Sequence, residues 1–98
     1  KGDVLTVAQI AGINAAKVTS SLIPLCHNIV LDHIKVELVP DEAGIMAESE
    51  VQCTGRTGAE MEALTAVSVA LMTVYDMCKS VDKMMVIDRV MVTEKTKI

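Results

Sequence analysis

Two reactive side chains stand side by side in SLIPLCHN, residues 21–28, directly after a proline. Cys26 supplies a thiol and His27 an imidazole, which are groups of metal ligation and of nucleophilic catalysis. Adjacent residues do not easily chelate one ion, and no zinc-type spacing joins them to the other histidine and cysteines, so we expect no metal site. A thiol nucleophile would need a base from elsewhere in the fold. On these two residues alone, a packed cysteine beside a loop histidine is the simplest interpretation.

An acid and a lysine lie three residues apart in YDMCK, where Asp76 and Lys79 become neighbours on one helix face. An exposed pair of this kind is usually a surface ion pair worth at most about 1 kcal/mol. Asp76, however, follows thirteen uncharged residues, 63–75, so we expect it at the edge of a buried surface. A lysine that loses solvent there has a lowered pKa and can exchange protons.

A loop rich in glycine and threonine precedes a predicted helix in TGRTGAEME, residues 54–62. Free N–H groups at a helix N-terminus, together with Arg56, can hold an anion, although the spacing is not that of a P-loop. Glu60 and Glu62 fall in the first helical turn, where the helix dipole favours acids. The same acids would repel a phosphate, and they suit instead the amino and imino edge of a purine-like ring.

The elements that position these groups follow from hydrophobic periodicity. An amphipathic helix is predicted ahead of Pro24. Thr6 and Gln9 have the spacing of a capping box at its start, and Asp3 is a second N-cap candidate. Gly12 weakens this helix by roughly 1 kcal/mol and permits close approach of another element. The apolar residues expected on its buried side are Val7, Ile10, Ala11, Ala15 and Val18.

Two alternating segments, residues 34–38 and 47–54, predict half-buried strands joined by the turn PDEAG, hence an antiparallel hairpin. A second helix is predicted from Ala59 to about Lys79. Because its middle is apolar or small all the way round, we expect it to be buried on more than one side. A last strand is predicted over residues 84–95.

The order helix, strand, strand, helix, strand becomes the ferredoxin-like β-α-β-β-α-β arrangement when one strand is added in front. We therefore expect an α+β protein with an antiparallel sheet, two helices on one face, and a first strand missing from this chain. The 98 residues suit one domain, 1–98, without linker or repeat.

The amino-acid composition argues for some classes of binding partner and against others. Apolar residues make up 51% of the chain, more than a small monomer easily hides, so we expect a buried subunit interface. The thirteen-residue uncharged stretch is too short to span a bilayer and no signal peptide is visible, so no membrane partner is expected. The net charge of −4 and the single aromatic residue argue against nucleic acid. Three widely spaced cysteines are typical of reduced thiols, in a cytoplasmic protein or, in a eukaryote, a mitochondrial one.

Four motifs together resemble the cyclic pyranopterin monophosphate synthases, the MoaC family of molybdenum cofactor biosynthesis. They are KGDVLTVAQIAGINAAK, LIPLCH, TGAEMEALT and YDMCKSVDKMMVI, in order over nearly the whole chain. The resemblance implies a lyase that converts 3′,8-cyclo-7,8-dihydroguanosine 5′-triphosphate into cyclic pyranopterin monophosphate and releases pyrophosphate. It implies no metal or organic cofactor and a radical-SAM enzyme upstream. It also implies a hexamer, a trimer of dimers, with active sites at subunit interfaces.

The resemblance assigns roles to single residues. The family's catalytic positions fall on Lys1, Asp76, Lys79 and Lys95. Its substrate-binding corner falls on Leu25, Cys26 and His27, and a second substrate-contacting pair falls on Met61 and Glu62, with Glu60 beside it. Arg56 is a further candidate cation for the triphosphate. The chain stops at KTKI, without the Gly-rich, basic tail common in the family.

A second class of function is a non-catalytic ferredoxin-like module that oligomerises and binds a small ligand, because fold does not fix function. The set of catalytic positions favours the enzyme, since a ligand sensor has no need of convergent proton-transfer and phosphate-binding groups. RNA binding on the open sheet face is disfavoured by the acidic charge and the missing aromatic residues.

Overall fold

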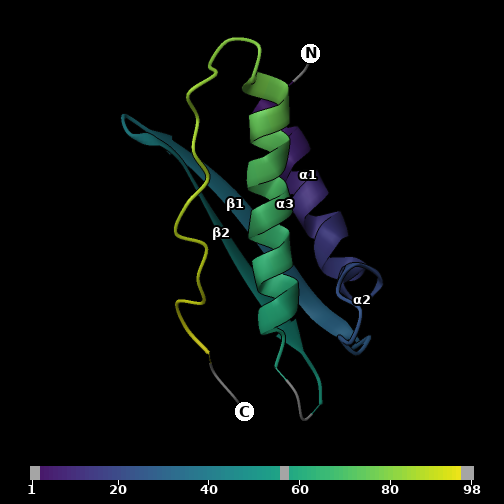
Figure 1. Ribbon diagram of the computed structural model, residues 1–98. Helices are drawn as coiled ribbons and strands as arrows, with labels where there is room; N and C mark the ends of the chain where they lie inside the picture. The colour runs from purple at the N-terminus through teal and green to yellow at the C-terminus, as the bar shows by residue number, and fades with distance from the viewer. Residues whose placement is uncertain (1–2, 56–57, 96–98) are drawn as a thin grey trace.

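The computed structural model describes residues 3–55 and 58–95 of the chain. Its elements are α1 (Val4–Lys17), α2 (Thr19–Leu22), β1 (Leu31–Asp41), β2 (Gly44–Cys53) and α3 (Glu60–Cys78). Strands β1 and β2 form an antiparallel hairpin, the one sheet among the described residues. Helices α1 and α3 pack against each other and against the hairpin (Figure 1). The α+β class, with two helices on one face of an antiparallel sheet, is confirmed.

Helices α1 and α3 cross closely because small residues line both of them. Ala8 on α1 and Ala66 and Ala70 on α3 are fully buried. A side chain at Gly12 would bring its Cβ to 2.8 Å from the Ala66 carbonyl oxygen and 3.3 Å from the Ala70 Cβ. The close approach predicted at Gly12 is therefore confirmed, and its missing side chain is what permits it.

The predicted buried side of α1 is only partly confirmed. Ala15 is buried as predicted, but Val7, Ile10 and Val18, which follows the helix, are 40%, 53% and 47% exposed. The other buried positions of α1 are Ala8, Gly12 and Ala16. A close crossing selects the smallest side chains, so the bulky face of α1 stays outside this chain.

Asp3 caps α1. Its carboxylate accepts hydrogen bonds from the backbone N–H groups of Leu5 and Thr6, at 3.1 and 3.2 Å. The Thr6 hydroxyl also donates to Asp3, at 2.8 Å, so Thr6 lies inside the helix and the predicted capping box with Gln9 is wrong. The side-chain bond from Thr6, followed by the backbone bonds, lowers the pKa of Asp3.

The hairpin follows its predicted alternation. Val36 is 1% exposed, and alternate residues of β2 are half-buried against α3. The Ser49 hydroxyl donates to the Ala63 carbonyl at 2.8 Å and ties β2 to α3. The Gln9 side-chain amide donates to the Val36 carbonyl at 2.8 Å and ties α1 to β1.

The hydrogen bond from Gln9 shows which backbone groups of the hairpin point outward from its two edges. Because the Val36 carbonyl faces α1, Val36 and its cross-strand partner Ser49 form a pair whose N–H and C=O groups point away from the hairpin. The groups of Ala47 and Val51 share that direction on β2. No strand within residues 3–55 and 58–95 pairs with this outer edge of β2.

Residues 84–95, the predicted last strand, form no strand, so that prediction is wrong for the described chain. The segment returns along α3 and runs in the same direction as β2 (Figure 1). A strand needs a neighbour for its hydrogen bonds, and this segment finds none in the described part. The expected first strand, which would supply one, stays a prediction.

Helix α3 is long and apolar enough to span a membrane by length and composition alone, as core helices also can be. Its Ala66, Ala70 and Val74 lie in the hydrophobic core. Met72 and Tyr75 are 53% and 38% exposed. Burial on more than one side is therefore incomplete within one chain.

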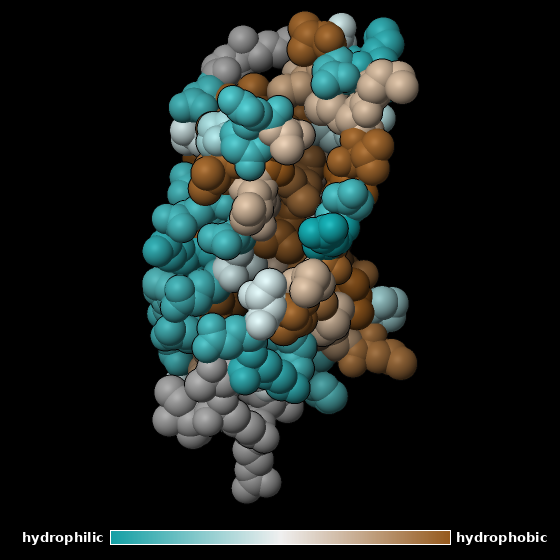
Figure 2. All heavy atoms as spheres, turned by 90° about the vertical axis from the view of Figure 1, so that its left-hand side faces the viewer, coloured by the Kyte–Doolittle hydropathy of each residue, from teal (hydrophilic) through white to brown (hydrophobic). Residues whose placement is uncertain are grey.

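Apolar side chains are also exposed in the chain after α3. Figure 2 shows hydrophobic residues gathered in the middle and on the right of one face, beside hydrophilic residues on its left. The exposed apolar residues of this part are Val81, Met84, Val86, Ile87, Val90, Met91 and Val92. This surface leaves apolar area available for another chain.

Candidate active site

The loop after α2 and the start of α3 enclose a hollow of about 360 Å³. Its lining residues are Ile23, Leu25, Cys26, His27, Ile29, Gly58, Met61 and Glu62. The hollow therefore joins the two predicted substrate-binding groups, which lie far apart in the sequence. Its size is within the range of small-molecule sites.

The LCH corner is shaped by a turn at the end of α2. The backbone N–H of Cys26 donates to the Ile23 carbonyl at 3.1 Å. Thr19, 1% exposed, anchors α2 by donating to the Ala15 and Ala16 carbonyls at 3.0 and 3.1 Å. Leu25 is left 93% exposed at the mouth of the hollow.

Cys26 and His27 do not form a nucleophile–base pair. The Cys26 thiol lies 3.7 Å from the His27 carbonyl oxygen, as a weak donor to the backbone. Cys26 is half-buried and His27 is exposed. The corner therefore offers a packed thiol and an imidazole that a ligand can reach.

Glu62 is the buried charge of the site. It is 4% exposed and lies in the first turn of α3, where the helix dipole favours its negative charge. None of the described residues forms a hydrogen bond or ion pair with its carboxylate, whose oxygens keep some contact with solvent in the wall of the hollow. An acceptor placed there can bind donors on a ligand.

Glu60 faces Lys95 rather than the hollow. The Lys95 Nζ lies 2.8 Å from the Glu60 Oε2, and the two side chains are 62% and 33% exposed. Gly58 touches both features: it lines the hollow, and a Cβ there would lie 2.6 Å from the Glu60 Oε1 and 3.6 Å from the Lys95 Cε. Lys95 is therefore held at the rim.

Asp76 and Lys79 form the predicted ion pair at the other end of α3. Lys79 Nζ lies 3.0 Å from Asp76 Oδ1. The side chains are 73% and 63% exposed, so the expected edge of a buried surface is wrong within one chain. From Glu62, this pair lies roughly 21 Å along the axis at the helical rise of about 1.5 Å per residue.

The structure thus gathers most of the predicted substrate-binding residues and Lys95 at one end of α3, and leaves Asp76 and Lys79 at the other. Lys1 and Arg56 lie outside the described residues. Ile23, Ile29 and Gly58 also line the hollow. Sequence reasoning missed them as single residues, although Gly58 belongs to the loop proposed to bind an anion.

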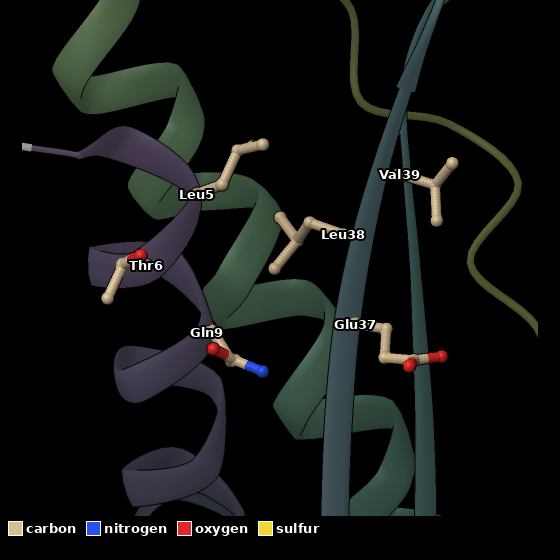
Figure 3. A pocket seen from close by; sticks show the side chains of 6 residues that line it. All are labelled: Leu5, Thr6, Gln9, Glu37, Leu38 and Val39. Atoms are coloured by element: carbon tan, nitrogen blue, oxygen red, sulfur yellow. The ribbon is translucent and has the colours of Figure 1, made fainter.

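A second hollow, of about 260 Å³, lies between α1 and β1 (Figure 3). None of the predicted site residues lines it, and the Gln9 amide beside it is already bonded to the Val36 carbonyl. No group of three or more histidine, cysteine, aspartate or glutamate residues is arranged for a metal in the part of the chain that the structure describes.

The sequence matches the model of the MoaC family over residues 1–97. A Chloroflexus aggregans protein named cyclic pyranopterin monophosphate synthase is 59% identical over 97 residues, which cover 97% of this chain and 59% of that protein. An Arabidopsis thaliana protein named cyclic pyranopterin monophosphate synthase, mitochondrial, is 60% identical over 98 residues, 98% of this chain and 36% of that protein.

A Drosophila melanogaster protein named molybdenum cofactor biosynthesis protein 1 is 58% identical over 98 residues. These residues cover 98% of this chain and 17% of that protein. The chain thus spans about three fifths of the bacterial relative and a smaller part of the two eukaryotic ones.

Proposed function

The chain belongs to the MoaC family, and from this premise we propose that the protein is a cyclic pyranopterin monophosphate synthase. Its substrate is 3′,8-cyclo-7,8-dihydroguanosine 5′-triphosphate, which a radical-SAM enzyme supplies, and its products are cyclic pyranopterin monophosphate and pyrophosphate. The printed names of the Chloroflexus and Arabidopsis relatives support this product. The reaction takes place in the cytoplasm, or in mitochondria in a eukaryote.

The observation that carries the proposal is the hollow with the Glu62 carboxylate in its wall, a nearly buried residue that no described residue binds. The amino and imino groups of a guanine-derived ring are paired donors, and a carboxylate accepts two such bonds. Ile23, Ile29 and Met61 supply apolar contacts for the faces of the ring. His27 supplies an imidazole at the open side.

Four cations are candidates for binding the triphosphate. Lys95 is held at the rim of the hollow by Glu60. Lys1, Arg56 and Lys79 are the other cations that we assign to the phosphates or to proton transfer. Pyrophosphate leaves when a hydroxyl of the substrate attacks its phosphate, so holding the two ends of the substrate together is a large part of the catalysis.

The site needs a second copy of the chain. Glu62 and Asp76 lie roughly 21 Å apart along α3, too far to act on one substrate from the same helix. We place the Asp76–Lys79 end of one copy against the hollow of another. Exposed apolar residues on α1 and after α3 support this contact, and the assembly that we propose is a hexamer, a trimer of dimers.

Assembly with a second subunit would allow Lys79, beside Asp76, to exchange protons with the substrate. Both are exposed in one chain and form an ion pair at 3.0 Å. Covering the pair with a neighbouring subunit would remove water and favour the neutral amine. Lys79 can then exchange protons with the ring as the imidazole part of the purine opens.

The test is product formation from the cyclised nucleotide triphosphate. Pyrophosphate release and the fluorescence of the oxidised pterin are measured for the wild type, for Lys79→Ala and for Glu50→Gln, an exposed control on the outer face of the hairpin. We expect both signals in the wild type and the control, and neither in Lys79→Ala. A folded wild-type oligomer without product would instead support the non-catalytic ligand-binding module.

A further inference from the structure

Glu60 and Lys95 join two parts of the chain that are far apart in the sequence. Lys95 comes at the end of the described chain, from a segment that forms no strand. Its ammonium lies 2.8 Å from the Glu60 carboxylate, the shortest ion pair in residues 3–55 and 58–95. The pair fastens the end of this segment to the first turn of α3.

Both side chains of this ion pair lie against Gly58. A Cβ at Gly58 would lie 2.6 Å from the Glu60 Oε1, so a side chain there would push the end of Glu60 aside. The Glu60 carboxylate therefore lies over Gly58, where the missing side chain leaves room for it. The Lys95 stem passes the same glycine at 3.6 Å from that Cβ position, and Gly58 itself lines the hollow.

From this geometry we propose that Glu60, seated on Gly58, is a positioning residue that holds the Lys95 ammonium at the rim of the hollow and does not itself bind substrate. The proposal rests on the proposed function, and it changes the role that the family resemblance gave to Glu60. Glu60 is absent from the lining of the hollow, whereas Gly58, Met61 and Glu62 are part of it.

The physical advantage is preorganisation. A free lysine side chain loses rotamer freedom when a phosphate fixes it, and Lys95 is already fixed by Glu60. An ammonium has three N–H donors. Lys95 can therefore keep one bond to Glu60 while it donates to phosphate oxygens.

A double-mutant cycle tests whether Glu60 acts through Lys95. Glu60→Gln, Lys95→Gln and the double variant are assayed for kcat and KM with the cyclised triphosphate. We expect Glu60→Gln to raise KM roughly threefold to fivefold, the range of an exposed ion pair, with a smaller change in kcat. In the Lys95→Gln background the same substitution should change nothing further. An equal loss in both backgrounds would show that Glu60 binds substrate directly, and would overturn the proposal.

A second measurement does not depend on activity. Backbone order parameters of residues 84–95, from ¹⁵N relaxation, should fall in Glu60→Gln and stay unchanged in the control Glu50→Gln. The exchanged pair, Glu60→Lys with Lys95→Glu, should restore the order parameters but not the wild-type KM, because the cation then stands on α3. Unchanged order parameters in Glu60→Gln, or a wild-type KM in the exchanged pair, would contradict the positioning role.

The role of Glu60 and the proposed enzyme activity can each prove wrong without the other. An inactive wild type would remove the proposed function and leave the comparison of order parameters intact as a test of the ion pair. An active wild type with an additive cycle would keep the function and remove the role of Glu60.

Discussion

Glu62 and Asp76 lie on one helix, α3, yet at opposite ends and in opposite environments. Glu62 is 4% exposed in the wall of a hollow, and the Asp76 side chain is 73% exposed. Their separation is roughly 21 Å along the helix axis. A single active site that uses both must therefore take them from two copies of the chain.

Mixed oligomers test this arrangement. At a substrate concentration too low to saturate Glu62→Gln, this variant and Lys79→Ala should each have little activity alone. Oligomers assembled from an equal mixture should recover about a quarter of the wild-type activity, because random pairing leaves some interfaces with both groups intact. Turnover is measured after co-refolding, with each variant refolded alone as control. Mixtures as inactive as their components would place both groups in one chain.

Glu62→Gln separates binding from folding. The amide replaces one acceptor oxygen by a donor, so the affinity for the substrate should fall roughly tenfold to hundredfold. The free energy of unfolding should change by less than about 0.5 kcal/mol, since no described residue forms a hydrogen bond or ion pair with that carboxylate. Calorimetric titration and urea unfolding measure the two effects. A large loss of stability with intact binding would make Glu62 a structural residue.

Gly12→Ala should destabilise the fold even though alanine is the better helix former. Its Cβ would lie 2.8 Å from the Ala66 carbonyl oxygen, a backbone atom that cannot move alone. We expect a loss of roughly 1–3 kcal/mol in the free energy of unfolding. The matched control is Asn14→Ala on the exposed side of α1, which should change it little. Equal or higher stability of Gly12→Ala would contradict the close crossing.

The Asp3 cap should weaken in acid. Its pKa is lowered from 3.8 by the bonds from Thr6 and Leu5. A lowered folded-state pKa gives stability that is complete above the unfolded value and is lost as the pH falls through the folded value. Amide exchange at Thr6 should therefore speed up below about pH 4 relative to the helix centre. Asp3→Asn, which cannot titrate, should remove this dependence, and a persisting one would point to another group.

One cross-strand pair of the hairpin places two like charges opposite each other, and the next pair along the same face places opposite charges there. Glu37 is paired with Glu48, whereas Lys35 is paired with Glu50. Glu48→Lys should raise the free energy of unfolding by roughly 0.2–1 kcal/mol, and Glu50→Lys should lower it by a similar amount. Both changes should shrink in high salt, because the side chains are exposed. Thermal unfolding at two ionic strengths checks this, and effects of the same sign would show that strand pairing does not govern them.

The hairpin could be predicted from the sequence because a strand repeats every two residues, so one wrong position would expose a whole face. Which face of α1 is buried could not be predicted from the sequence. Val7 and Ile10 dominate its hydrophobic pattern, but the crossing with α3 selects Ala8 and Gly12 for their small size.

Contacts between residues that are far apart in the sequence could not be predicted either. Gln9 has capping-box spacing, and the fold uses its amide for the distant Val36 carbonyl instead. Asp76 and Lys79 could be paired from their spacing, since helix geometry brings them together. Glu60 and Lys95 could not, because only the return of the chain along α3 makes them neighbours.

The open edge of β2 bears on how the protein behaves at high concentration. The N–H and C=O groups of Ala47, Ser49 and Val51 point outward, and no described strand covers them. Edges of this kind add strands from identical molecules, which is a route to aggregation and fibrils. Solubility of the 98-residue chain should therefore depend on how completely that edge is occupied.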